Sequence, residues 1–332
     1  MKQHRSLMLV AALVAGVLAG CAQTPSAPEQ SLQAQQAIKL ADRNWDKFNK
    51  AQLEKLIAQN GKSSASYNPA KPPYAVFDWD NTMVFLDVEE ATLIYQLENL
   101  KFNMTPAQMD KALRMNIPAT NFKPDYNSAA GQPVSIDLAV PDAVESYTWL
   151  YDNYAGLKGK LSLDEVKKSP HYMNFITKVR YLYEAIGDTF DVSVSYPWVL
   201  YLFTGLDEQQ VRKMVQETVD WQLTQPVEKV KWTSPATLPG KAGVVSVSWK
   251  NGLRLMPEMQ DLFHTFRAAG IDVWICSASF VDVIKEISSN PKYGYNNPAD
   301  RVVAMELERD AKGAIQTEFR RGYDQKIGRA HV

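Results

Sequence analysis

The sequence predicts a doubly wound α/β domain, and two apolar runs that end in polar residues are the basis of that prediction. Residues 74–77 are apolar at consecutive positions and lead directly into the acidic segment 78–82. Residues 271–276 form a second strand-like run, which is followed by small polar residues and then by a helical pattern. Strands that are apolar on consecutive positions are typical of parallel sheets buried on both faces. Helices before and after the second run complete the expected alternation of helix and strand.

The beginning of the chain is predicted to be a lipoprotein signal peptide. Basic residues precede an apolar run over residues 7–20, which is short of the ~20 apolar residues that a membrane helix needs. The run ends in Leu-Ala-Gly-Cys, which resembles a bacterial lipobox. We therefore expect cleavage after residue 20 and a lipid anchor at Cys21, the alternatives being an uncleaved anchor or a chance cysteine. Ala22 favours the outer membrane of a Gram-negative bacterium, with the protein facing the periplasm.

Residues 21–71 are expected to lead from the membrane to the folded domain. Pro, Ser and Gln are frequent in residues 21–36, so this segment is predicted to be a flexible tether. Residues 37–71 are predicted to be a helix and a linker, because apolar residues recur at helical spacing over 37–59 and Asn-Gly follows.

Composition limits the partners. Cys276 is the only cysteine besides Cys21 and lies in an apolar run, so no disulfide framework is expected. The formal net charge is −1 and the basic residues are dispersed, which argues against a nucleic-acid-binding surface. The expected partners are a small molecule and the membrane.

Two carboxylates at the end of the first predicted strand give the strongest indication of function. Side chains two apart in an extended segment point the same way, so Asp78 and Asp80 are expected to face one ligand. Close carboxylates repel each other, and a bound cation or a shared proton relieves that repulsion. A turn that only bonds its own backbone is one alternative. A calcium loop is another, but Met83 stands where such a loop carries Gly.

These residues resemble motifs of the haloacid dehalogenase-like (HAD) superfamily of phosphatases. Asp78-Trp79-Asp80-Asn81-Thr82 resembles its first motif, DxDxT, and Ser277 resembles its second. Shorter strings resemble the exported phosphorylcholine phosphatase branch, near the phosphoserine phosphatases; they lie at residues 74–78, 196–199, 203–205 and 293–296.

The resemblance implies a HAD-like doubly wound parallel sheet with a large, mostly helical cap domain inserted after the first motif. The core is expected from residues 72–86 and 253–326, and the cap from residues 87–252, a segment too long for a simple crossover. Helices are expected in the core over 257–269 and in the cap over 88–100, 105–115, 141–154, 162–167, 170–186, 196–202 and 207–221.

The resemblance also implies a mechanism through an aspartyl-phosphate. Asp78 would attack phosphorus, and Asp80 would protonate the leaving oxygen and later deprotonate the hydrolytic water. Thr82 would hold the motif turn, and Ser277 would donate to a phosphoryl oxygen. Mg²⁺ would bind Asp78, the Asp80 carbonyl and the phosphate. The expected substrate is a small phosphate ester such as phosphorylcholine or phosphoserine.

Residues of the cap are expected to bind the rest of the substrate. Asp87 lies nine residues after Asp78, the offset at which phosphoserine phosphatases carry an acidic residue facing the substrate amine. Glu90, Tyr181 and Tyr183 are further candidates, because aromatic faces beside a carboxylate bind quaternary ammonium. Packing in the hydrophobic core is the alternative for the tyrosines.

The end of the chain departs from the superfamily pattern. The third motif needs a lysine, for which Lys312 and Lys326 are the late candidates, and the acidic pair of the fourth motif has no match. Residues 327–332 spell the translation of a common sequencing-adapter stretch, so we expect a non-native tail after Lys326, the alternative being a genuine six-residue end. Such a truncated chain would be poorly active. A catalytically inactive lipoprotein that binds a phosphorylated or cationic ligand is the alternative function.

Overall fold

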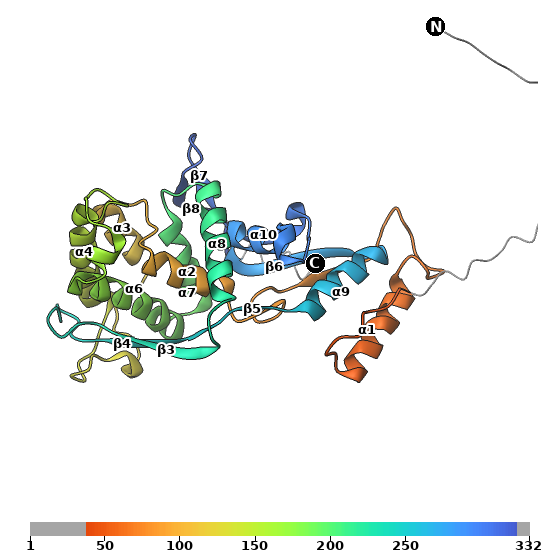
Figure 1. Ribbon diagram of the computed structural model, residues 1–332, viewed down its shortest axis with the longest axis horizontal. Helices are drawn as coiled ribbons and strands as arrows, with labels where there is room; N and C mark the ends of the chain where they lie inside the picture. The colour runs from red at the N-terminus through yellow and green to blue at the C-terminus, as the bar shows by residue number, and fades with distance from the viewer. Residues whose placement is uncertain (1–37, 324–332) are drawn as a thin grey trace, which may run out of the picture. The chain divides into compact units, whose positions relative to one another are not determined.

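The central sheet has four strands in the order β1-β6-β7-β8 (Figure 1). The computed structural model describes residues 38–323. β1 (Tyr74–Phe77) pairs in parallel with β6 (Asp272–Phe280), which pairs in parallel with β7 (Val302–Arg309). β8 (Ile315–Arg321) runs antiparallel to β7. The predicted α/β fold is thus confirmed, with an antiparallel edge strand that the apolar pattern did not indicate.

β1 is an edge strand among the described residues, which changes its predicted burial. Phe77 packs against Phe263 and Phe266 of the helix that covers one face of the sheet. Tyr74 and Val76 are 63% and 42% exposed. The prediction of a strand buried on both faces is therefore wrong, because the exposed Tyr74 and Val76 alternate with the half-buried Ala75 and Phe77, so within residues 38–323 only one face of β1 is covered.

The helices next to the sheet are α9 (Pro257–Ala268) and α10 (Val281–Ser289). α1 (Lys47–Asn60) lies beside α9 (Figure 1). A helix was predicted over 37–59, but the described residues before Lys47 are not helical. In that segment Ala41 N–H donates to the Asp261 side chain of α9 instead of to a carbonyl of its own helix. Asp46 caps α1 by accepting from Asn49 N–H at 2.9 Å.

In the chain, a helical insert separates β1 from the other three strands of the sheet. The chain leaves through β2 (Val84–Phe85) and returns through β5 (Arg254–Leu255), and these two strands pair with each other. The insert contains α2 (Val88–Glu98), α3 (Pro106–Arg114), α4 (Ile136–Asn153), α5 (Leu163–Val166), α6 (Pro170–Thr189), α7 (Val192–Trp198), the 3₁₀ helix η2 (Val199–Phe203) and α8 (Glu208–Gln222).

The predicted helices of the insert are all present, with two changes. α4 begins at Ile136 and carries Pro141 in its second turn, so it starts before the predicted residue. The helix predicted over 196–202 is split, because α7 ends after Pro197 and a tighter 3₁₀ turn follows. A hairpin of β3 (Glu228–Thr233) and β4 (Ser246–Asn251) was not predicted and runs along α6 (Figure 1).

Several predictions concern residues outside those described. They are the signal peptide over 1–20, the lipid anchor at Cys21, the tether over 21–36, Lys326, and the tail over 327–332. The proposed boundaries between core and cap also stay predictions. Within residues 38–323, none of the helices combines the length and the apolar character needed to cross a bilayer.

Candidate active site

The acidic motif forms a tight turn at the carboxyl end of β1. The carbonyl of Trp79 accepts from the N–H groups of Thr82 and Met83, at 3.1 and 2.7 Å. Asn81 has a φ of 54°, a left-handed conformation that Asn tolerates better than most residues. The Trp79 side chain is fully buried and packs edge-on against Tyr295 beneath the turn. The buried indole therefore anchors the turn that carries the two carboxylates.

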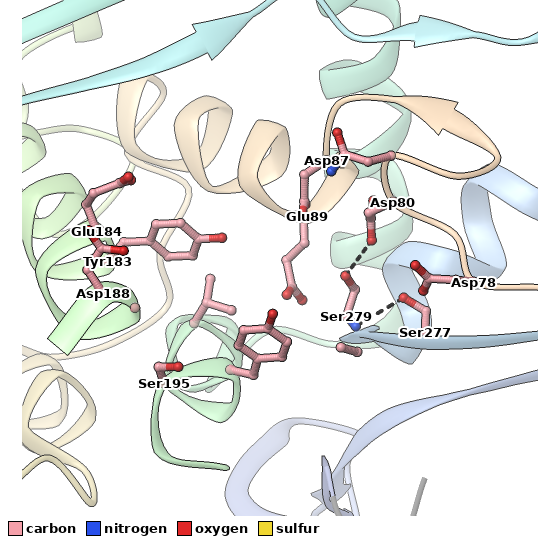
Figure 2. A pocket seen from close by; sticks show the side chains of 15 residues that line it. Asp78, Asp80, Asp87, Glu89, Tyr183, Glu184, Asp188, Ser195, Ser277 and Ser279 are labelled. Carbon is pink, nitrogen blue, oxygen red and sulfur yellow. Dashed lines mark hydrogen bonds between the residues drawn. The ribbon is translucent and has the colours of Figure 1, made fainter. Parts of the chain in front are cut away.

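Asp78 and Asp80 have different surroundings, although both line the same cavity (Figure 2). Asp78 is exposed, and Thr82 Oγ1 donates to its Oδ2 at 3.3 Å. Asp80 is partly buried; its Oδ1 accepts from Val88 N–H and its Oδ2 from Ser279 Oγ, both at 2.7 Å. Asp78 is thus accessible, whereas Asp80 is held between the start of α2 and strand β6.

Ser277 lies inside β6, because the strand continues to Phe280. Cys276 pairs with Val303 of β7 and Phe280 with Met305, so β6 carries two additional residues in this stretch. This irregularity is a bulge. Ser277 is buried, lines the cavity and accepts from Ser279 N–H through its Oγ at 3.1 Å.

The segment after Ser277 also differs from the helix start expected there. α10 begins at Val281, and Phe280 occupies its N-cap position without a side-chain cap. Phe280 N–H donates instead to Glu89 Oε1 at 2.7 Å. Since Glu89 belongs to α2, this bond ties the bulge of the core sheet to the first helix of the insert.

These residues open into a cavity of about 330 Å³ between the sheet and the insert. Figure 2 shows Tyr183, Glu184 and Asp188 on the side of the cavity away from Asp78. Six of its lining side chains are carboxylates, so its potential is strongly negative and favours cations. The complete lining is Asp78, Asp80, Asn81, Asp87, Glu89, Tyr183, Glu184, Gly187, Asp188, Ser195, Tyr196, Val199, Ser277, Ala278 and Ser279.

Asp87 lines the cavity and caps α2 by accepting from Glu90 N–H at 2.8 Å. Burial raises the pKa of Asp87 to about 8, and the charge of Asp80 acts in the same direction. Two backbone hydrogen bonds oppose this rise. The carboxyl is consequently mostly neutral near pH 7, and a cation bound beside it would favour its ionised form.

The insert side of the cavity is held by a buried arginine. Arg180 donates to Glu184 at 2.9 Å and to Glu90, and its guanidinium lies 4.8 Å from the centre of the Tyr183 ring. Asp188 accepts from the hydroxyl of Tyr126 at 2.6 Å. Arg180 thus fixes the position of Glu184 and Tyr183 in the cavity wall.

The structure brings some of the predicted substrate-binding residues into the cavity and not others. Asp87 and Tyr183 line it. Glu90 does not line it and pairs with Arg180 instead. Tyr181 is buried inside the insert, where its ring meets Phe122 and its hydroxyl donates to the carbonyl of Tyr126.

Other cavity residues could not be found from sequence motifs. Asp188 and Ser195 lie more than a hundred residues after the acidic turn and belong to no recognisable spacing. The hydroxyl of Ser279 donates to Asp80, a contact that no sequence motif indicates. Lys312, a candidate for the phosphate-binding lysine, lies in the turn between β7 and β8 and is absent from the cavity lining.

The acidic turn supplies oxygen atoms of the kind that Mg²⁺ prefers, namely the Asp78 carboxylate and the Asp80 carbonyl. No group of three or more His, Cys, Asp or Glu side chains within residues 38–323 is arranged to hold one ion. The oxygens of the acidic turn therefore do not by themselves make up a complete metal site within the described residues.

Comparison with known proteins agrees with this architecture. No protein-family model matches the chain. A phosphorylcholine phosphatase of Pseudomonas aeruginosa is 23% identical over 262 residues, 79% of this chain and 54% of that protein, so the chain spans about half its length. The crystal structure of a conserved functionally unknown protein from Anaerococcus prevotii DSM 20548 aligns with a TM-score of 0.80 and 30% identity, over 86% of this chain and 74% of that one.

A phosphoserine phosphohydrolase-like protein from Francisella tularensis is more distant. It covers 74% of this chain and 64% of that chain at 11% identity and a TM-score of 0.27, which is too low to support an argument. The Anaerococcus protein shares both the fold and nearly a third of the aligned residues. The chain therefore belongs to the same family as the Anaerococcus prevotii protein.

Proposed function

We propose that the protein is a Mg²⁺-dependent phosphomonoesterase that forms an aspartyl-phosphate on Asp78. One observation carries the proposal: an accessible Asp78 and a firmly held Asp80 share a cavity at the carboxyl end of β1. Ligands of parallel sheets bind at that end of the strands. Ser277 lines the same cavity and offers a hydroxyl for a phosphoryl oxygen.

The proposed reaction has two steps. An Asp78 oxygen attacks phosphorus, the bond from phosphorus to the ester oxygen breaks, and Asp80 gives its proton to the departing alcohol. Water then attacks the aspartyl-phosphate, Asp80 takes the proton from this water, and inorganic phosphate and free Asp78 result. The exposure of Asp78 suits a nucleophile, and the fixed position of Asp80 suits an acid and base.

Mg²⁺ is proposed because the cavity is acidic and a phosphate ester is an anion. Asp78 and the Asp80 carbonyl would hold the cation, and bound Mg²⁺ would neutralise charge on the phosphate and the carboxylates around it. The six acidic side chains of the lining support a requirement for such a cation.

The substrate is proposed to be a small phosphate ester that carries a cationic group, such as phosphorylcholine or phosphoserine. Glu184 and Asp188 give the wall away from Asp78 a negative potential, and Tyr183 and Tyr196 add aromatic faces to the cavity lining. The name of the Pseudomonas relative supports the choline ester. The lipobox-like end of the signal sequence supports action in the periplasm, from a lipid anchor at Cys21.

The proposal is tested by phosphate release from phosphorylcholine, phosphoserine and p-nitrophenyl phosphate, using the protein expressed from its complete gene with Mg²⁺ or with EDTA. We expect turnover that EDTA abolishes and that Asp78→Asn lowers by about 10³-fold or more, because a carboxamide is a far weaker nucleophile. Asp137→Asn is the matched control, since Asp137 pairs with Arg114 on the exposed surface of the insert. Undiminished turnover by Asp78→Asn would contradict the nucleophile. Binding of phosphorylcholine without hydrolysis of any ester would favour the non-catalytic alternative.

A further inference from the structure

We infer that Ser279 is a positioning residue that aims Asp80 at the leaving oxygen of the substrate. The inference rests on the proposed function, because it concerns the acid of that reaction. The contact that suggests it is the hydrogen bond from Ser279 Oγ to Asp80 Oδ2, at 2.7 Å (Figure 2).

The carboxylate of Asp80 is fixed from two sides. Val88 N–H donates to Oδ1 and Ser279 Oγ to Oδ2, so each oxygen has a short contact to a different element. Val88 begins α2 of the insert, and Ser279 belongs to β6 of the sheet. Two contacts to different oxygens determine both the direction of the side chain and the rotation of its carboxylate plane.

The bulge of β6 directs Ser279 to this position. Between Cys276 and Phe280 the strand is out of step with β7, and bulges redirect side chains in this way. Two N–H groups of this stretch donate to side chains that line the cavity. Ser279 N–H donates to Ser277 Oγ, and Phe280 N–H donates to Glu89 Oε1. Ser279 is only 5% exposed, so its side chain has little freedom to turn elsewhere.

The direction of this hydrogen bond suits an acid that must give its proton to the substrate. The Ser279 hydroxyl donates to Oδ2, and a carboxyl oxygen can accept such a bond in both the ionised and the protonated form. The contact therefore leaves the acidic proton of Asp80 for the leaving oxygen.

The test uses the dependence on the leaving group, which a loss of stability alone does not change. p-Nitrophenolate is a stable anion and departs without a proton, whereas the alkoxide of choline needs one. The ratio kcat/KM reports the steps up to departure of the alcohol, so it isolates the step in which Asp80 is the acid. A misdirected Asp80 lowers this ratio for phosphorylcholine far more than for p-nitrophenyl phosphate.

We expect Ser279→Ala in the whole protein to lower kcat/KM for phosphorylcholine by about 10²-fold, near the lower limit for general acid catalysis. The same ratio for p-nitrophenyl phosphate should fall by less than about 5-fold, because only the proton transfer is impaired. Ser279→Thr keeps the hydroxyl and should restore most of the loss. Ser288→Ala is the matched control, since it removes a buried hydroxyl from α10 away from the cavity.

A double variant separates this role from a general effect on folding. With Asp80→Asn already present, adding Ser279→Ala should cost almost nothing further for phosphorylcholine, because the two residues act through one step. Equal losses for both esters, or additive losses in the double variant, would overturn the role of Ser279 and leave the proposed function intact. A wild-type protein that hydrolyses neither ester would instead refute the proposed function and this inference with it.

Discussion

At the scale of single residues, three carboxyl groups within ten positions of the chain have three different environments. Asp78 is open to the cavity, Asp80 is held by two donors, and Asp87 caps a helix where burial raises its pKa to about 8. Proximity alone would not divide nucleophile from acid. Accessibility and hydrogen bonding are the basis of the proposed roles, and the hydrogen bonding of Asp80 depends in part on Ser279, far from the turn in sequence.

The raised pKa of Asp87 predicts a dependence of stability on pH. Between about pH 4 and 8 the group is protonated in the folded state and ionised in the unfolded one, so unfolding releases a proton. The contribution of Asp87 to the free energy of unfolding is therefore fully present below about pH 4. It is lost as the pH rises to about 8, at roughly 1.4 kcal/mol per pH unit at most. Asp87→Asn keeps the helix cap and removes the titration.

Urea unfolding of both proteins in EDTA, from pH 5 to pH 8, measures this contribution. The free energy of unfolding of the wild type should fall relative to Asp87→Asn as the pH rises. Parallel curves for the two proteins would show that burial does not raise the pKa of Asp87. Repeating the series with Mg²⁺ should reduce the effect, because a cation beside Asp78 and Asp80 counters their charge.

At the scale of elements, a buried ion pair joins two helices and a loop of the insert. Lys178 of α6 donates to Asp142 of α4 at 2.5 Å and to the carbonyl of Pro239 at 2.9 Å. Burial lowers the pKa of Lys178, and Asp142 opposes that change. Asp142 also accepts from Lys241 N–H, and the loop passes so close that a Cβ on Gly240 would lie 2.2 Å from its Oδ1.

Asp142→Ala should destabilise the protein by about 3–5 kcal/mol, because it leaves the Lys178 ammonium buried without its counter-charge. Asp137→Ala on the same helix breaks an exposed pair with Arg114 and should cost less than about 1 kcal/mol. Chemical denaturation compares the two. A loss for Asp142→Ala as small as that of the control would mean that water replaces the missing carboxylate.

At the scale of the molecule, α8 of the insert and α10 of the core are joined by one buried carboxylate. Glu286 accepts from Arg212 at 2.6 Å, from Gln216 at 2.8 Å and from Asn290 at 2.7 Å. Burial acts to raise the pKa of Glu286, but these three donors together lower it. Because Arg212 and Gln216 belong to α8, the hydrogen bonds to Glu286 hold α8 of the insert against α10, which packs on the sheet.

Glu286→Gln should lower the free energy of unfolding by about 1.5–3 kcal/mol, the usual contribution of hydrogen bonds to a charged group. Because the pKa of Glu286 is lowered in the folded protein, this stabilisation is fully present at pH values above the usual pKa of a glutamate. It is lost as the pH falls from that usual pKa through the lowered one. Glu208→Gln, on exposed pairs of α8, is the control and should change stability by less than about 1 kcal/mol. Equal unfolding curves for Glu286→Gln and the wild type at pH 7 would contradict the joint.

The sequence by itself determined the elements that depend on local pattern. Apolar spacing and capping residues located most helices of the insert, and α9 was predicted to within one residue of its end. Asp78, Asp80 and Ser277 were singled out by their resemblance to superfamily motifs, and the structure places all three in the lining of one cavity. The hairpin β3–β4 was missed, since its strands are half exposed and mostly polar.

Only the tertiary structure decided which distant groups meet. Ser279 contacts Asp80 across 199 positions of the chain, and Phe280 contacts Glu89 across 191. It also showed that β1 is an edge strand among the described residues and that Tyr181 packs away from the cavity. The spacing of apolar residues indicates which face of a helix or strand is apolar, but the order of the strands and the packing of the helices decide what covers that face. The contact between Ser279 and Asp80 and the acidic wall of the cavity are products of that packing.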